Sequence, residues 1–279
     1  MREKILAIVN KEQNLPPLPE VLSKIEQKVY DPDTCISDIS TLIYTEPVLS
    51  GNLMRLANSV FIGGGRDKAE DLDNAIGRLG LKMVLDLAYT LELPKITSGN
   101  KVINQGAFWR HAFGTAVCSR SLSELFSQDE DQRENAYLSG LMHDVGILVF
   151  LHSIPKEYED FLGKIVGQEE SLENLERESF GIDHVELGAK YIEKWWPVSK
   201  SVVDQIKRHH EPFGSDSKNV LSLANIFVNA LGFPNKVGPE LIEELDFVQL
   251  IGISEIELGE LKEKVSDAID QLGSLFGGN

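Results

Sequence analysis

The sequence predicts an all-α protein, and three observations support that fold class. Apolar residues recur every three or four positions, as in Val21 to Val29 and Ile36 to Ile43, which is the buried stripe of an amphipathic helix. The alternating apolar and polar pattern of β-strands is scarce. Segments rich in proline or glycine interrupt the helical pattern at short intervals. We therefore expect many helices joined mostly by short turns, with no fixed-period repeat.

The expected helix boundaries in the first part of the chain follow from the chemistry of helix ends. Leu15 to Pro19 precedes one helix, Asp31 to Thr34 separates two, and Gly63 to Gly65 follows another. The proline-rich segment Asn14 to Val21 fits either a polyproline ligand or a stiffened helix entry with Pro19 in the first turn. We favour the helix entry.

Three further boundaries are predicted from single residues. Thr45 fits the N-cap of a helix that begins near Pro47, and Gly80 fits a helix C-cap. Ser254 with Glu257 three residues later has the pattern of a capping box, which predicts that the last helix begins there.

Composition and charge exclude several classes of protein. The 279 residues include 27 Lys and Arg against 44 Asp and Glu, a net charge of −17, which disfavours general binding to nucleic acids and to anionic lipid surfaces. Only Cys35 and Cys118 occur, so neither a disulfide framework nor a thiolate zinc site is expected. No apolar segment has the length of a membrane span or the core of a signal peptide. A cytoplasmic protein without membrane association is expected, and the sequence leaves its oligomeric state open.

The interruption of the helical pattern between Pro94 and Gln105 is the expected domain boundary. It separates an N-terminal helical lobe, residues 1–100, from a second lobe, residues 101–279, which ends in acidic helices. All six histidines lie in the second lobe. Any metal or acid-base chemistry that uses histidine must therefore be assembled there.

Five of these histidines occur in contexts that favour metal binding. His111 lies in a helical pattern with small residues, His143 precedes Asp144 in an apolar segment, His184 opens an amphipathic helix, and His209 and His210 close another. Successive residues on a helix point about 100° apart, so the pair His143 and Asp144 can serve one ion only near a helix end or distortion. Imidazole-rich donors favour Fe, Mn, Zn, Ni or Co, as one or two ions. His152 is interpreted as an ordinary histidine outside this set.

The N-terminal half resembles the HDOD family, the HD-related output domains, in an ordered series of motifs. The residues that carry the resemblance are Leu15-Pro-Pro-Leu-Pro19, Asp31-Pro32, Glu46-Pro-Val-Leu49, Leu53 to Asn58-Ser59 and Ala75-Ile-Gly-Arg-Leu-Gly80. Glu46 departs from the usual Asp. The resemblance covers roughly residues 14–230 as one continuous unit and implies an N-terminal helical lobe followed by a degenerate HD-type lobe.

The second half resembles the HD superfamily of metal-dependent phosphohydrolases, and in particular its HD-GYP branch, which hydrolyses cyclic dinucleotides. This resemblance implies a set of metal ligands, which comprises His111, His143, Asp144, His184, His209 and His210. Asn225 stands at the position of the late ligand Asp and lacks its charge. Ile147 stands where the HD-GYP signature has a phosphate-binding Lys, and the GYP loop is missing.

Together these features predict a bacterial signalling output or adaptor module of the HDOD type, without catalytic residues, whose surviving ligands are sufficient to hold a transition metal. The resemblance implies regulation through a separate signalling protein, and it is compatible with a nucleotide ligand. The alternative is a metal-dependent phosphohydrolase or phosphodiesterase, in which Asp144 and a metal-bound hydroxide would carry the reaction. P-loop, dinucleotide-binding and zinc-protease motifs do not occur in the sequence.

Overall fold

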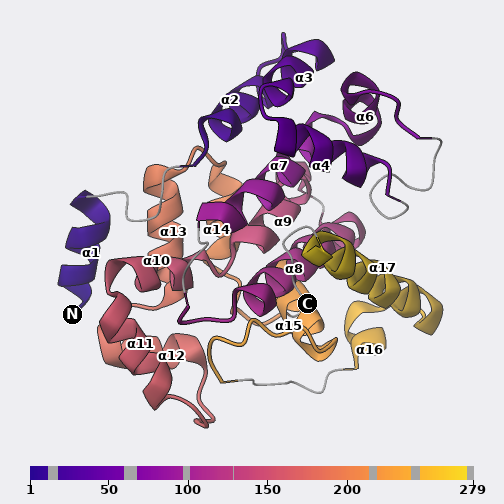
Figure 1. The fold of residues 1–279 in the computed structure, drawn as a ribbon. Helices are drawn as coiled ribbons and strands as arrows, with labels where there is room; N and C mark the ends of the chain where they lie inside the picture. The colour runs from indigo at the N-terminus through magenta and orange to yellow at the C-terminus, as the bar shows by residue number, and fades with distance from the viewer. Residues whose placement is uncertain are drawn as a thin grey trace. The chain divides into compact units, whose positions relative to one another are not determined.

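The computed structural model describes residues 1–11, 18–59, 68–96, 101–127, 129–213, 219–239 and 246–274. All regular secondary structure in these ranges is α-helical, which confirms the predicted fold class (Figure 1). The expected features at Leu15 to Pro17 and at Gly63 to Gly65 lie outside the described residues. No single helix in the described ranges is both long enough and apolar enough to cross a bilayer.

The chain forms two compact units, residues 17–96 and residues 1–16 with 97–279. The first unit contains α2 (Glu20–Val29), α3 (Ile36–Tyr44), α4 (Pro47–Ala57), α6 (Leu72–Leu79) and α7 (Leu81–Ile96). The second unit contains α1 (Arg2–Lys11), α8 (Gln105–Phe126), α9 (Glu130–Met142), α10 (Val145–Ser153), α11 (Pro155–Lys164), α12 (Leu172–Phe180), α13 (His184–Trp195), α14 (Lys200–Ile206), α15 (Val220–Ala230), α16 (Phe247–Ile251) and α17 (Glu255–Ser274).

Helix ends in the first unit agree with the sequence at one predicted cap and differ at another. Gly80 ends α6 with φ of 77°, a conformation that glycine adopts without steric cost. Thr45 does not cap α4: it follows α3, where its hydroxyl donates to the Leu42 carbonyl at 2.6 Å, and Glu46 takes the N-cap position. The hydrogen bond from the Thr45 side chain to a carbonyl of the preceding turn competes with the predicted hydrogen bond that would cap α4.

The interior of the first unit holds a buried acid. The Tyr89 hydroxyl on α7 donates to the Glu26 carboxylate on α2 at 2.6 Å, and Glu26 is 4% exposed. Burial raises the pKa of Glu26 to about 7, against lowering contributions from the Tyr89 hydrogen bond and from Lys82. This unit contains no histidine.

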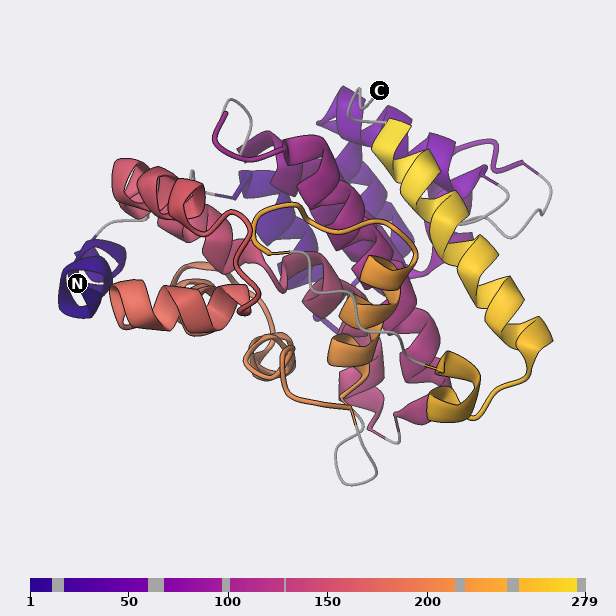
Figure 2. The same cartoon turned by 90° about the horizontal axis from the view of Figure 1, so that it is seen from below.

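Helix α8 is the central element of the second unit and packs against α9, α15 and α17 (Figures 1 and 2). Gly114 permits this packing, because a Cβ there would lie 2.7 Å from Cδ1 of Ile269 on α17 and 3.0 Å from Val228 on α15. The predicted capping box at the start of α17 is present: Glu257 N donates to Ser254 Oγ at 3.2 Å and Ser254 N to Glu257 Oε2 at 2.8 Å.

Helices α10 and α13 cross with their backbones in contact. A Cβ at Gly146 would lie 1.8 Å from the carbonyl oxygen of His184, and a Cβ at Gly188 would lie 2.8 Å from the Gly146 nitrogen. Two glycines are therefore required at this crossing. The crossing brings the first residue of α13, His184, next to the first residues of α10, where Asp144 lies.

Candidate metal centre

Four separate segments of the second unit supply the histidines and the aspartate. His111 lies on α8, and His184 is the first residue of α13. His209 and His210 lie in the turn that follows α14. His143 and Asp144 occupy the break between α9 and α10, with His143 as the C-cap of α9 and Asp144 as the N-cap of α10. The break is the helix end that the sequence required for adjacent residues to reach one site.

The first cluster comprises His111, His143 and Asp144, all of which are buried. The Nε2 atoms of His111 and His143 lie 3.2 Å apart. Oδ2 of Asp144 lies 3.2 Å from Nε2 of His143 and 4.0 Å from Nε2 of His111. Three ligand atoms from α8 and the break between α9 and α10 thus lie close together.

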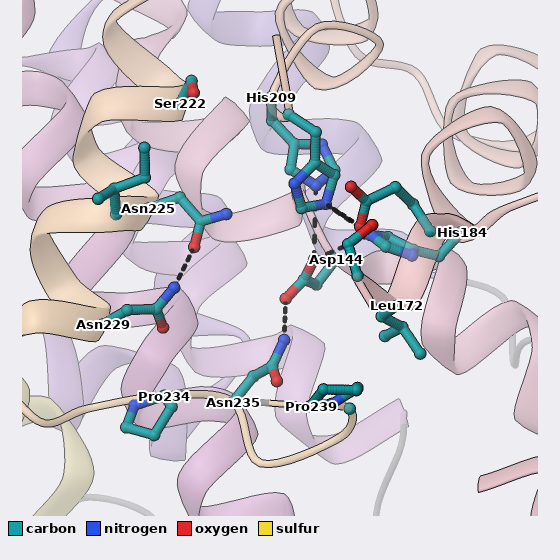
Figure 3. Close-up of a pocket in the computed structure, with 15 residues that line it drawn as sticks. Asp144, Leu172, His184, His209, Ser222, Asn225, Asn229, Pro234, Asn235 and Pro239 are labelled. Carbon is teal, nitrogen blue, oxygen red and sulfur yellow. Dashed lines mark hydrogen bonds and ion pairs between the residues drawn. The ribbon is translucent and has the colours of Figure 1, made fainter. Parts of the chain in front are cut away.

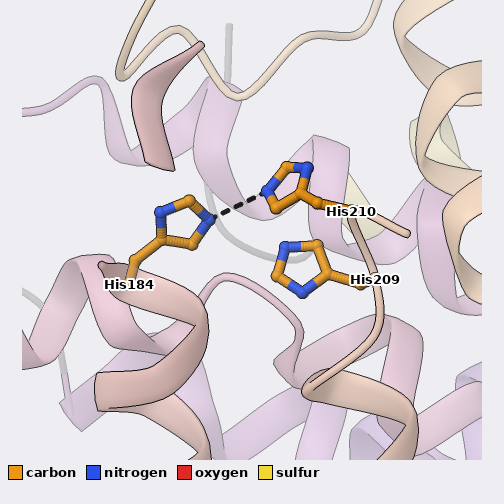
Figure 4. Close-up of side chains that lie close together, drawn as sticks. All are labelled: His184, His209 and His210. Carbon is orange, nitrogen blue, oxygen red and sulfur yellow. Dashed lines mark hydrogen bonds between the residues drawn. The ribbon is translucent and has the colours of Figure 1, made fainter. Parts of the chain in front are cut away.

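The second cluster comprises His184, His209 and His210 (Figure 4). The Nε2 atoms of His184 and His210 lie 3.1 Å apart. Oδ1 of Asp144 lies 3.7 Å from Nε2 of His184 and 3.7 Å from Nε2 of His209. Asp144 therefore faces the first cluster with one carboxylate oxygen and the second cluster with the other.

Backbone and carboxylate acceptors fix the other ring nitrogen of four histidines. The Nδ1 atoms of His111, His143 and His209 lie 2.8–2.9 Å from the carbonyl oxygens of Phe233, Gly140 and Ile206, respectively, and Nδ1 of His184 lies 2.7 Å from Oε2 of Glu176. A carbonyl or carboxylate oxygen only accepts, so Nδ1 carries a proton in each case, and a neutral ring held in this way presents a lone pair on Nε2. Such partners orient the ligating histidines of metal sites.

The two Nε2 atoms of the first cluster face each other with no hydrogen-bond donor from the described residues between them. In the first cluster two Nε2 lone pairs face each other at 3.2 Å beside a carboxylate oxygen. Nε2 of His209 is buried and has no hydrogen-bond partner among the described residues. Buried acceptors without donors cost free energy unless a cation or a proton sits between them. This set of ligand atoms therefore fits a metal ion.

Glu176, on α12, is a buried support for His184. Its Oε2 accepts from the backbone N of His184 at 2.6 Å and from its ring Nδ1 at 2.7 Å, and its Oε1 accepts from the Tyr158 hydroxyl at 2.5 Å. Burial acts to lower the pKa of His184, but the charge and hydrogen bond of Glu176 outweigh it and raise the pKa to about 9. A cation that binds at this Nε2 must displace a proton.

The remaining charges divide into neutral rings and one anionic carboxylate. Burial, with His143 nearby, lowers the pKa of His111 to about 4, and burial lowers the pKa of His209 well below its usual value. Burial acts to raise the pKa of Asp144, but the surrounding imidazoles, with His143 first, hold it well below the usual range. At neutral pH His111 and His209 are therefore neutral and Asp144 is ionised, which are the forms that bind metals, whereas His184 carries a proton.

An open cavity of about 240 Å³ borders the cluster. Its lining includes the acids Asp144 and Glu173 and the protonated ring of His184, and no Lys or Arg is among the residues that line it in the described part of the chain. Oε2 of Glu173 lies 3.8 Å from Nε2 of His210. Burial acts to raise the pKa of Glu173, but His210 and the first turn of α12 outweigh it and lower the pKa.

Asparagine amides cover another side of the cavity (Figure 3). Asn235 Nδ2 donates to Oδ2 of Asp144 at 2.6 Å, and Asn229 Nδ2 donates to Oδ1 of Asn225 at 3.3 Å. Asn225, which the resemblance places at the position of the late ligand, thus lines the cavity as a neutral amide.

Two other predicted positions lie away from the cavity. Ile147 is fully buried in the core and does not line the cavity. The residue at the position of the signature Lys therefore packs in the core. His152 hydrogen-bonds the Leu148 carbonyl at 2.8 Å and belongs to neither cluster.

The structure brings together all six residues of the predicted ligand set, and it adds four that the sequence did not single out. The additional residues around the site are Tyr158, Glu173, Glu176 and Asn235. Glu173 and Glu176 lie in an acidic run of α12 that has the composition of a solvated helix. The one available signal was their spacing of three residues, which places both on one face of α12.

The fold and the site define a class of all-helical proteins that gather histidines and an aspartate from separate helices around one buried centre. The chain belongs to the HDOD domain family, which matches residues 15–212. The resemblance that the motifs carried is thereby confirmed.

Several solved structures share this fold, and one relative is similar in sequence over most of the chain. An HDOD domain protein from Geobacter sulfurreducens is 21% identical with a TM-score of 0.73, and the match covers 98% of each chain. A candidate phosphohydrolase from Shewanella amazonensis is 22% identical with a TM-score of 0.72, over 98% of this chain and 97% of that one. A candidate signal transduction protein from Marinobacter aquaeolei is 20% identical with a TM-score of 0.70, over 99% of this chain and 65% of that one. An uncharacterised protein from Treponema pallidum is 24% identical over 204 residues. The match covers 73% of this chain and 39% of that relative's length.

Proposed function

We propose that the protein is a signalling output module of the HDOD type that binds one or two divalent transition-metal ions and does not turn over a substrate. The observation that carries the proposal is the convergence of four imidazoles on the two oxygens of Asp144, with His210 joined to them through His184. Candidate ions are Fe, Mn, Zn, Ni and Co, because nitrogen donors dominate the set.

The protonation state of the site supports metal binding. His111, His143 and His209 are held through Nδ1 and offer Nε2, so no ring has to reorient to become a ligand. Asp144 supplies a negative charge between the clusters. When bound, the metal would supply Lewis acidity toward an oxygen ligand in the cavity.

The composition of the cavity supports binding without turnover. Hydrolysis of a phosphoester requires stabilisation of the charge that develops on the phosphoryl oxygens, which cationic side chains commonly provide. The described lining of the cavity supplies no Lys or Arg, and it carries the acids Asp144 and Glu173. Asn225 adds no charge, and Ile147 is in the core. The carboxylates of Asp144 and Glu173 would therefore repel an anionic substrate.

A signalling role is supported by the family and by the name of the Marinobacter aquaeolei protein, whose chain extends beyond the match. We propose that this protein acts in the cytoplasm through a protein partner and that a net charge of −17 disfavours nucleic acid as that partner. A partner with a basic surface fits this charge.

The first test is metal analysis of the full chain purified without chelator. We expect at least one transition-metal ion per chain, reduced by Asp144→Ala and unchanged by His152→Ala, a histidine outside the site. The same protein is then assayed against cyclic dinucleotides, cyclic mononucleotides and p-nitrophenyl phosphoesters. A chain that binds no metal would contradict the metal-binding proposal.

The alternative function is metal-dependent phosphoester hydrolysis, and the cavity itself favours it. The cavity opens directly on Asp144 and His210, so a ligand can reach the centre. Turnover that depends on added metal and is abolished by Asp144→Ala would establish the enzyme and refute the adaptor. Binding of a nucleotide without turnover would support the adaptor.

A further inference from the structure

We propose that Glu173 is a carboxylate ligand of the second cluster and that the first ion bound by the protein occupies His184, His209 and His210 rather than His111 and His143. The inference rests on the proposed metal binding and assigns the site that fills first. It gives a function to a residue outside the predicted ligand set.

The position of Glu173 fits a ligand in contact with the cavity. Its Oε2 lies 3.8 Å from Nε2 of His210, and Nε2 of His210 lies 3.1 Å from Nε2 of His184. The Glu173 side chain is 17% exposed and lines the cavity, so it faces the cluster instead of bulk solvent. No basic residue in the described structure forms an ion pair with it at 4.0 Å or less apart from His210.

The two clusters then differ in negative charge. The second cluster has Glu173 and one oxygen of Asp144, whereas the first cluster has only the other oxygen of Asp144 beside the neutral amide of Asn225. Divalent cations bind more tightly where more anionic ligands surround them. The second cluster is also next to the cavity, so an ion can enter there without crossing the core.

A purely structural role for Glu173 makes a different prediction. Glu173 lies in the first turn of α12, where a negative charge interacts favourably with the helix dipole. Glu173→Asp keeps the charge in that turn but withdraws the carboxylate from His210. A structural role predicts that Glu173→Asp preserves both stability and metal binding, whereas a ligand role predicts preserved stability and weakened binding.

The experiment uses the full chain stripped with a chelator and titrated with Mn²⁺, followed by calorimetry and by the electron paramagnetic resonance of the ion. We expect Glu173→Gln and Glu173→Asp to weaken the first Mn²⁺ by about 10- to 100-fold. The matched control Glu178→Gln alters an exposed acid of the same helix and should leave binding unchanged. His111→Asn should leave the first ion in place, and Asn225→Asp should add a second.

The outcomes separate this inference from the metal proposal itself. Wild-type protein that binds no Mn²⁺ and no Zn²⁺ refutes both. Wild-type binding that Glu173→Gln and Glu173→Asp leave intact refutes only the role of Glu173. Loss of the first ion in His111→Asn, with retention in Glu173→Gln, would assign that ion to the first cluster. Circular dichroism of each variant verifies that the helices are formed.

Discussion

The hydrogen bonds between Glu176 and His184 allow a quantitative prediction for Glu176→Gln. Glu176 accepts three buried hydrogen bonds, two from His184 and one from Tyr158. Glutamine can keep this arrangement, because its amide oxygen can accept from His184 while its NH2 group donates to the Tyr158 hydroxyl, which also accepts hydrogen bonds. The substitution removes the charge that keeps the His184 ring protonated without changing the size of the side chain.

The size of the effect follows from the pKa. A pKa of about 9 for His184, against 6.5 for an ordinary histidine, corresponds to about 3 kcal/mol in favour of the protonated ring. Because the folded pKa is raised, this stability is fully present below pH 6.5 and is lost as the pH rises through about 9. In the variant, burial lowers the pKa of the ring against the charges of Asp144 and Asp183 alone, so the pKa should fall from about 9 toward that of an ordinary histidine.

The assay is urea unfolding of chelator-stripped protein between pH 6 and pH 10, with the histidine pKa followed by NMR. The free energy of unfolding should differ between wild type and Glu176→Gln by about 3 kcal/mol more at pH 6 than above pH 9. A loss of stability that is independent of pH would show that Glu176 acts only through packing. A His184 pKa that stays near 9 in the variant would refute the assigned cause.

Three further predictions concern acid stability, helix crossing and the buried acid of the first unit. The folded pKa of His111 is about 4, so between pH 6.5 and pH 4 the unfolded chain binds the proton more readily than the folded chain. The free energy of unfolding therefore falls by about 1.4 kcal/mol for each unit of decreasing pH. His111→Asn should reduce that slope in urea titrations. Gly146→Ala should cost more than the ~1–3 kcal/mol of ordinary overpacking, because the new Cβ overlaps the His184 carbonyl; a thermal midpoint equal to wild type would contradict the crossing. Glu26 has a folded pKa of about 7, so its ionisation destabilises the folded state as the pH rises from 4.5 through 7. Glu26→Gln should therefore raise the free energy of unfolding at pH 8 by up to about 3 kcal/mol. A destabilised variant at pH 8 would show that Tyr89 requires the ionised carboxylate.

The elements that local chemistry determines were predictable from the sequence. The apolar spacing indicated helices, and the bonds between Ser254 and Glu257 and the positive φ of Gly80 depend on neighbours within a few residues. The adjacent residues His143 and Asp144 required a helix end, and the structure has one there. Such signals act over one or two turns and do not depend on the rest of the fold.

The residues that surround the ligand set depend on tertiary packing and gave no such signal. Asn235 meets Asp144 across 91 positions of the chain, and Tyr158 meets Glu176 across 18. Ile147 was compared with a phosphate-binding Lys, but its side chain points into the core, and only the structure shows which face of α10 is buried. The Thr45 hydroxyl could cap the next helix or donate back to the Leu42 carbonyl, and propensity alone did not decide between these two bonds.

The short connection after α15 contacts two residues of the first cluster. The Phe233 carbonyl holds His111, and the Asn235 amide holds Asp144, while Lys236 between Asn235 and Val237 is exposed and has φ of 57°. Asn235 donates to the Asp144 oxygen that faces the first cluster, so an ion bound at that oxygen would compete with this hydrogen bond. Such competition would act on a segment that ends at the surface with Lys236, and not only on the buried helices.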